Sequence, residues 1–476
     1  MGNPLCKPFL TLRWRVSVWL DLAKEYKLSV TSCISWILLT IITATIAITL
    51  LCKYPAWDSK KKDSNNRPNN PRHEKWFYVW LIGLSTLGGF WALFLPLALS
   101  QKFDGPNADG NQLRLHLLYI TGGVLALTTL GETHRKNTLE KHKNDQDHIR
   151  QVHAERRSRY TTAIEQLSSD KASIRLGGVY TLVGLVDEWL ADEKTTPSHE
   201  ERRKEGQVII NNLCAYIRSP FLLAERAEHL DEPYAKDLQK DFDGDKEKFD
   251  TDKQTFKQHK ATLEEERQVR QSIIKEICER LRNVNEPGPW SDFDYDFSNA
   301  HFFYCVEFSD SIFGAFTKFS EAIFAKDADF SGAIFAEFAD FSISTFAEFA
   351  GFFSATFTRN ADFSRSTFTR NADFFWTTFA KDANFSKAKF TGDANFSWTI
   401  FEHKPIFEYT LDNKAYKARF SSKANPEDYN FEVSPDSPYK IETEEQEHNG
   451  VKFIIPKGTE LFDPDEPSDL EDDDES

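Results

Sequence analysis

The sequence predicts a multidomain protein with transmembrane α-helices, a cytoplasmic α-helical domain and a solenoid of very short β-strands. Three observations lead to this fold class. Long uncharged runs lie near the N-terminus, apolar residues recur at helical spacing in the middle of the chain, and phenylalanine recurs at alternating steps of five and six residues over 297–407. At 476 residues the chain is long enough for several domains.

Residues 1–131 are predicted to form a membrane domain with two to three transmembrane helices. The runs 33–52 and 76–99 contain no charged residue, and 115–131 is a shorter third run. About 20 apolar residues cross the hydrocarbon core of a bilayer, so the lipid bilayer is the first expected partner. The alternative is a buried helix of a soluble protein. A cleavable signal peptide is not expected, because the leading segment is long and polar.

Lysine and arginine in short loops favour the cytoplasmic side of a membrane. The loop 53–75 carries seven of them and the loop 101–114 carries two. Three spans therefore place the loop 53–75 and everything after residue 131 in the cytoplasm, which predicts a multi-pass protein of a bacterial inner membrane. The basic N-terminus conflicts with this topology, so its side, and the choice between two and three spans, stay open.

The segment 132–157 is predicted to be a charged helical stalk, and 158–286 an α-helical domain with a charged insertion. The histidines of the stalk lack the spacing of a metal pair on one helix face. A calcium-like run, 241–252, has Lys246 where an EF-hand loop needs glycine and Asp252 where it needs glutamate. Six scattered cysteines form no paired spacing. No metal and no cofactor are expected.

The phenylalanine rhythm excludes ordinary helices and strands. Steps of five and six put successive rings on two faces of a helix, and a step of five reverses the face of a strand. A chain that turns every five or six residues, with one ring inward per side, fits the pattern. The rings assigned to the core are Phe330, Phe335, Phe341, Phe346, Phe352, Phe357, Phe363, Phe368, Phe374, Phe379, Phe385, Phe390, Phe396 and Phe401. The rings off the rhythm are Phe303, Phe316, Phe338, Phe349, Phe353 and Phe375.

A small residue, usually alanine or serine, lies two positions before most of these rings, and aspartate or asparagine often lies between the two. Units such as ADFSG and ANFSK resemble the pentapeptide repeat, with phenylalanine at the central site. The resemblance implies a right-handed quadrilateral β-helix over about 290–410. Two eleven-residue periods then make one coil of about 22 residues, and the rod has about five coils at a spacing of roughly 4.8 Å. The segment 158–218 resembles a module that precedes such repeats in bacterial membrane proteins.

The ends of the chain complete the domain plan. Residues 411–457 are predicted to cap the rod, with a hairpin around His448–Asn449–Gly450. The net charge is −16, and 458–476 holds ten acidic residues and no basic one, which indicates a disordered acidic tail.

A coil of this length stacks Lys326, Glu348 and Arg370 in one column and Glu337, Arg359 and Lys381 in another. Solvated pairing along these columns is the simpler interpretation. The alternative is that Arg359, Arg370 and Lys381 form a recognition strip for an acidic partner.

No catalytic motif is present: the sequence lacks a phosphate loop, GxSxG, HExxH and the Rossmann glycines. The function expected is a membrane-anchored, non-enzymatic scaffold that presents the rod to an unidentified protein partner, with a homo-oligomer left open. Some members of the family mimic duplex DNA and act on topoisomerases. DNA mimicry is therefore one alternative, a membrane sensor or channel is another, and no nucleic acid is expected as a ligand.

The topology predicts that a reporter fused after residue 476 lies in the cytoplasm. A fluorescent protein or a cytoplasm-dependent enzyme at this position should be active, and alkaline phosphatase, which needs export, should be inactive. The opposite pattern would place the C-terminal bulk outside and contradict the three-span arrangement.

Overall fold

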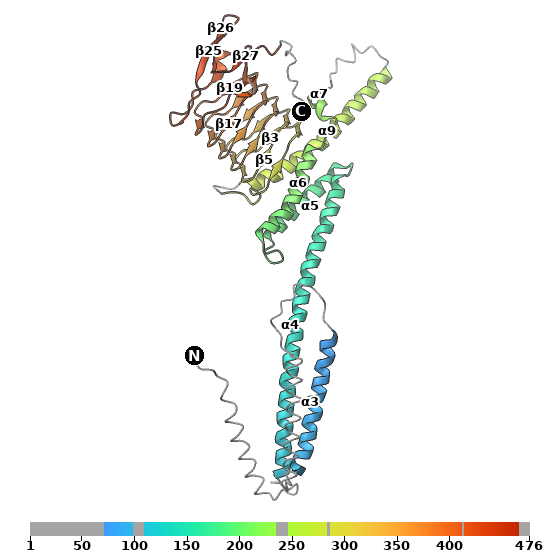
Figure 1. Cartoon of the computed structure of the whole chain (residues 1–476). Helices are drawn as coiled ribbons and strands as arrows, with labels where there is room; N and C mark the ends of the chain where they lie inside the picture. Colours follow the sequence, from blue (N-terminus) through green and yellow to red (C-terminus); the bar gives the residue numbers. More distant parts are fainter. Residues whose placement is uncertain (1–70, 99–108, 235–245, 283–285, 412–413, 466–476) are drawn as a thin grey trace, which may run out of the picture. The chain divides into compact units, whose positions relative to one another are not determined.

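The computed structural model describes residues 71–98, 109–234, 246–282, 286–411 and 414–465 (Figure 1). The chain divides into two compact units, 1–148 and 149–476, and each is considered by itself. The expected span 33–52, the side of the N-terminus, the first half of the calcium-like run and the last part of the acidic tail lie outside the described residues.

The first unit contains α3 (Pro71–Ala98) and the start of α4 (Asp109–Leu167). Within the described residues α4 is the one helix long and apolar enough to cross a membrane, while α3 has a shorter apolar stretch, Leu81–Pro96. Two of the predicted spans, 76–99 and 115–131, fall on α3 and α4, and these helices supply one candidate span. The two helices pack closely where Gly88 meets Thr121, because a side chain at Gly88 would collide with that threonine. Helix α4 continues without a break through 131–132 and 157–158.

The helical domain of the second unit is formed by the end of α4, α5 (Ala172–Ala191), α6 (His199–Arg218), η1 (Ala224–Arg226), α7 (Ala227–Asp231) and α9 (Lys246–Leu281). Its core consists of apolar side chains at helical spacing, such as Val186, Ile210 and Ile273. Gly178 lets α5 approach the backbone of α4, since a Cβ there would lie 2.7 Å from the Ala163 carbonyl oxygen.

This helical domain covers the N-terminal end of the solenoid (Figure 1). The buried guanidinium of Arg270 donates to Glu266 (2.7 Å) and to the backbone carbonyls of Ile217 and Ser219 (2.6 and 2.7 Å). It also lies over the ring of Phe303, which is one of the off-rhythm rings. The hydrogen bonds of this cation join α9 to the end of α6, and its contact with Phe303 links both helices to the first coil. Helices α6 and α9 also pack against β1 and β3, so they cover this open edge of the solenoid.

The solenoid has four sides, and each side is a parallel sheet whose strands come from successive coils. The first side is β1 (Tyr295–Asp296), β5 (Thr317–Lys318), β9 (Ala339–Asp340), β13 (Ala361–Asp362) and β17 (Ala383–Asn384). The second is β2 (His301–Phe302), β6 (Ile323–Phe324), β10 (Thr345–Phe346), β14 (Thr367–Phe368), β18 (Lys389–Phe390), β23 (Arg419–Ser421) and β27 (Glu460–Phe462). The third is β3 (Val306–Glu307), β7 (Ala328–Asp329), β11 (Ala350–Gly351), β15 (Ala372–Asp373), β19 (Ala394–Asn395) and β24 (Tyr429–Asn430). The fourth is β4 (Ile312–Phe313), β8 (Ile334–Phe335), β12 (Thr356–Phe357), β16 (Thr378–Phe379) and β20 (Ile400–Phe401).

The register confirms the coil length that the sequence predicts. Thr345 pairs with Thr367, and Phe357 pairs with Phe379. The inward rings form four columns along the axis, one for each side. In the column that contains Phe341 and Phe363 the two ring centroids are 4.9 Å apart and the planes differ by 4°. All fourteen core rings named from the sequence are buried.

Each eleven-residue period contains one corner with a left-handed backbone. The φ angle is near +60° at Asn299, Asp310, Glu321, Gly332, Ile343, Ser354, Arg365, Trp376, Lys387 and Trp398. Only one of these ten residues is glycine, although this conformation costs other residues about 1–2 kcal/mol. The aspartates and asparagines before the corner offset part of this cost. For example, the Asp362 carboxylate accepts a hydrogen bond from the Ser364 N–H (2.9 Å).

The solenoid continues beyond the predicted end of the repeats. After a hairpin of β21 (Glu408–Leu411) and β22 (Lys414–Lys417), Phe420 stacks on Phe390 and Phe431 stacks on Phe396. The segment 411–457 thus contributes strands to the rod and also the expected hairpin, β25 (Thr443–His448) and β26 (Val451–Pro456). The predicted tail needs correction as well, because β27 lies within it and pairs with β23.

The last strand of the second side is protected by a side chain. β27 pairs with β23 along one edge, and in the described residues no strand pairs with its other edge. There the Gln446 amide donates to the Thr459 carbonyl (2.8 Å) and accepts from the Leu461 N–H (3.3 Å). A single amide thus occupies the positions that a neighbouring strand would fill.

The phenylalanine columns predict a sharp contrast between two adjacent rings. Phe352 is buried between Phe330 and Phe374, whereas Phe353 is half-exposed at a corner. Phe352→Ala should lower the free energy of unfolding by about 3–5 kcal/mol, because it removes buried area and leaves a cavity. Phe353→Ala should cost about 1 kcal/mol or less. Urea unfolding followed by circular dichroism measures both, and equal losses would contradict the stacked core.

Removal of the Gln446 amide should expose the edge of β27. Gln446→Ala is expected to cause concentration-dependent self-association, measured by sedimentation velocity, because the freed backbone groups can pair with another chain. Glu447→Ala, an exposed neighbour on the same strand, should leave the sedimentation profile unchanged. If the two variants sediment alike, the amide does not protect the edge.

Candidate functional site

The described residues contain no group of three or more His, Cys, Asp or Glu side chains that could hold a metal ion. Two of the cysteines, Cys214 and Cys278, are buried at the joint between the helices and the solenoid. Burial raises the pKa of each thiol to about 12, so both stay protonated and unreactive.

The predicted charge columns form only in part. The Arg370 guanidinium lies 2.8 Å from the Glu348 carboxylate, and that of Arg359 lies 3.9 Å from Glu337. Lys326 instead contacts Asp231 of α7 at 3.8 Å. Lys381 is exposed one coil beyond Arg359. Exposed pairs of this kind contribute about 0–1 kcal/mol each, and the three basic residues remain a predicted interaction strip.

A second surface, which the sequence reasoning missed, lies at one left-handed corner between the third and fourth sides. Four outward aromatic residues gather there: Phe353, Phe375, Trp376 and Trp398. We call them the aromatic corner. Phe353 and Phe375 were noted as off the rhythm, but the two tryptophans were not singled out. Their signal in the sequence is that Trp376 and Trp398 are separated by the length of one coil.

Backbone ladders fix the aromatic corner in place. The Trp376 N–H donates to the Ser397 carbonyl (3.2 Å), and the Trp398 N–H donates to the Glu432 carbonyl (3.0 Å). The Phe353 and Phe375 rings are stacked with centroids 5.7 Å apart and planes 7° apart. Phe375 also lies 5.5 Å from the ring of Trp376. The tryptophans remain about half exposed, at 53% and 50%.

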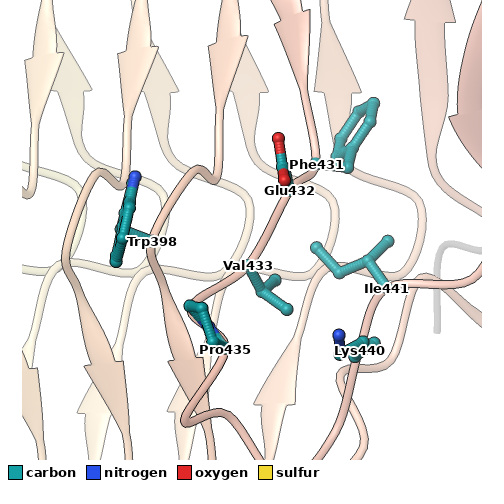
Figure 2. Close-up of a pocket in the computed structure, with 7 residues that line it drawn as sticks. All are labelled: Trp398, Phe431, Glu432, Val433, Pro435, Lys440 and Ile441. Atoms are coloured by element: carbon teal, nitrogen blue, oxygen red, sulfur yellow. The ribbon is translucent and has the colours of Figure 1, made fainter.

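A pocket of about 350 Å³ adjoins Trp398 at the C-terminal end of the rod (Figure 2). Its lining consists of Trp398, Phe431, Glu432, Val433, Pro435, Lys440 and Ile441. Figure 2 shows Trp398 on one side, Ile441 and Lys440 on the other, and Val433 and Pro435 between them. The segment that forms this lining is anchored on the last full coil, because the Ser434 N–H donates to the Thr399 carbonyl (3.0 Å). The pocket therefore has a rigid wall and continues the aromatic corner.

The two sides that meet at the aromatic corner differ in charge. The outward positions of the third side include Glu307, Asp329 and Asp373. Those of the fourth side are uncharged: Ile312, Ile334, Thr356, Thr378 and Ile400. Beside the aromatic residues the third side presents Gly351, Asp373 and Asn395, so the corner is an aromatic ridge between a face with one carboxylate and an uncharged, β-branched face.

A four-sided β-solenoid whose coils each stack four phenylalanines defines a class of repeat protein. The family described as pentapeptide repeats (9 copies) matches residues 352–400, within the solenoid. With a solenoid of about five turns over 295–401, the chain is a pentapeptide-repeat protein. No curated protein and no solved structure matches it.

Proposed function

We propose that this protein is a membrane-anchored, non-enzymatic scaffold that binds another protein through the side of its solenoid. The observation that carries the proposal is the aromatic corner, which exposes Phe353, Trp376 and Trp398 beside the half-buried Phe375, on a rigid rod whose remaining phenylalanines are mostly buried. Soluble proteins rarely leave contiguous apolar patches uncovered unless they bind something. Tryptophan and tyrosine are also the residue types that contribute most at protein interfaces.

The membrane part of the proposal is supported by α4 and α3. Large apolar side chains are exposed along the apolar part of α4, among them Ile120, Leu127 and Leu130. On α3, which packs against α4 at Gly88, Leu93 and Phe94 are exposed as well. A bilayer would bury these side chains, and the positive-inside rule would then place the solenoid at the cytoplasmic face of a bacterial inner membrane.

Charge argues against DNA mimicry. The segment 297–407 has 13 acidic and 9 basic residues, a net charge of −4. The charge is also uneven: 297–350 has 8 acidic and 2 basic residues, whereas 351–407 has 5 acidic and 7 basic residues. The second half of the rod is therefore positive by two charges. Duplex DNA carries one negative charge per about 1.7 Å along its whole length, so this surface is a poor imitation.

The proposal is tested by photo-crosslinking of the full-length protein in the cells that express it. A photoreactive amino acid is placed in turn at each of four corners, at Ser354, Thr358, Ile343 and Thr369, and captured proteins are identified by mass spectrometry. We expect one protein to be captured preferentially from Ser354, which lies at the aromatic corner. Capture of a topoisomerase would favour DNA mimicry over the scaffold function. Equal background capture from all four corners would refute the scaffold function.

A further inference from the structure

We propose that the pocket beside Trp398 binds a small zwitterion with an apolar body, of the size of an amino acid or a dipeptide. The inference goes beyond the proposed scaffold function, because its ligand is a small molecule and not the protein partner. Three features of the pocket carry it. They are its volume and lining, the hydrogen bonds that hold its walls, and two opposite charges that are not paired with each other.

The pocket has the size and the lining of a small-molecule site. Its volume of about 350 Å³ lies within the range of roughly 300–1,000 Å³ that is typical of such sites. At roughly 30 Å³ per water, this space equals about a dozen waters, which suits a ligand of about a dozen non-hydrogen atoms. The lining is apolar or aromatic except for Glu432 and Lys440. A mostly apolar lining with a few polar groups is the usual composition of a site that binds and orients a small molecule.

Both segments that form the pocket are fixed on the last full coil. The Trp398 N–H donates to the Glu432 carbonyl (3.0 Å), which holds the first segment. In the second segment the Ser437 hydroxyl accepts from the Phe401 N–H (2.9 Å) and donates to the Tyr439 carbonyl (2.6 Å). The Tyr439 N–H donates in turn to the Phe401 carbonyl (3.2 Å). The walls are therefore in place before a ligand arrives, and little ordering entropy is lost on binding.

Trp398 gives the pocket an aromatic wall from a strained backbone position. Its φ angle is +59° and half of its surface is exposed, whereas the same corner holds Gly332 and Ser354 in earlier coils. A large side chain is costly in this conformation, and strained positions concentrate at functional sites. Figure 2 shows the indole across the pocket from Ile441, so the apolar body of a ligand fits between them. The face of an indole also attracts an ammonium group.

The two charges of the pocket select a zwitterion. The Glu432 and Lys440 side chains are both exposed, and within the described residues neither forms an ion pair. Figure 2 shows Glu432 beside Phe431 and Lys440 beside Ile441. A simple cation or a phosphate would be attracted by one of these groups and repelled by the other. A zwitterion satisfies both, with its ammonium group at Glu432 and its carboxylate at Lys440.

The test measures binding of small peptides to the full-length protein in detergent micelles by saturation-transfer NMR, with empty micelles as the blank. Valylvaline is the zwitterion. Its N-acetyl form is an anion, its amide is a cation, and the form with both caps is neutral. Free leucine distinguishes an amino acid from a dipeptide as the better ligand.

We expect valylvaline to bind with a Kd below about 1 mM. Each single cap should weaken binding about fivefold, the upper range for one exposed ion pair. Glu432→Gln should make the free and N-acetyl forms bind alike, and Lys440→Gln should do the same for the free and amide forms. Trp398→Ser should weaken every form about tenfold, and Ser354 shows that serine is accepted at this corner. Glu445→Gln, which changes an exposed carboxylate on the hairpin, is the control and should bind as the wild type does.

Equal binding of the free and doubly capped dipeptides would overturn the inference, because the charges would then play no part. It would also fall if valylvaline gave no signal above that of the micelles, or if both glutamine substitutions left the effects of the caps unchanged. Tighter binding of leucine than of valylvaline would support the inference and assign the site to an amino acid. The crosslinking experiment uses no peptide, so its outcome and this one fail independently.

Discussion

The stacking of one phenylalanine per side, repeated in every coil, is the constraint on which the rest of the solenoid depends. Each buried ring contributes about 2–3 kcal/mol through burial and about 0.5–1.5 kcal/mol more through its aromatic neighbours. A shift of the register by one residue would turn the rings of a whole side outward. Columns such as Phe352 on Phe374, with parallel planes, therefore fix both the register and the spacing of everything on the surface.

This constraint explains where the sequence is free to vary. In the middle coils the inward positions hold phenylalanine or a small residue, and tyrosine enters only towards the ends, at Tyr295 and Tyr429. Variation therefore concentrates at the corners. At one left-handed corner the chain carries Asp310, Gly332, Ser354, Trp376 and Trp398 in successive coils. A residue with φ near +60° is costly outside glycine, asparagine and aspartate. The stacked coils supply enough stability to keep tryptophan in this conformation, and such strained positions concentrate at functional sites.

Much of the solenoid could be predicted because its signal is local and periodic. The coil length and the inward rings follow from spacing and composition. The sixth, partial coil was missed because the hairpin 408–417 interrupts the alternating five- and six-residue spacing of the phenylalanines. After the hairpin, Phe420 and Phe431 are again eleven residues apart. Arg270 could not be found from the sequence, since its partners Ile217 and Ser219 are far away in the chain. The aromatic corner was missed because each of its residues interrupts the repeat pattern at a different place in the sequence. Only the strand register shows that they lie above one another in successive coils.

The helices cover the N-terminal end of the solenoid and a side chain protects the last strand of its second side, which favours the sides of the rod as surfaces for binding. The helices cover the first coil through Arg270 and Phe303, and the Gln446 amide occupies the free edge of β27. A ligand therefore has to run along the rod or across it. A ligand that crosses the rod meets the polar outward residues of one coil. A ligand that runs along the rod meets aromatic rings of successive coils, which are separated by the constant spacing between coils. Because ladder hydrogen bonds hold these rings before binding, little ordering entropy is lost at the surface. A ligand that is itself stiff gains the most from a surface of this kind.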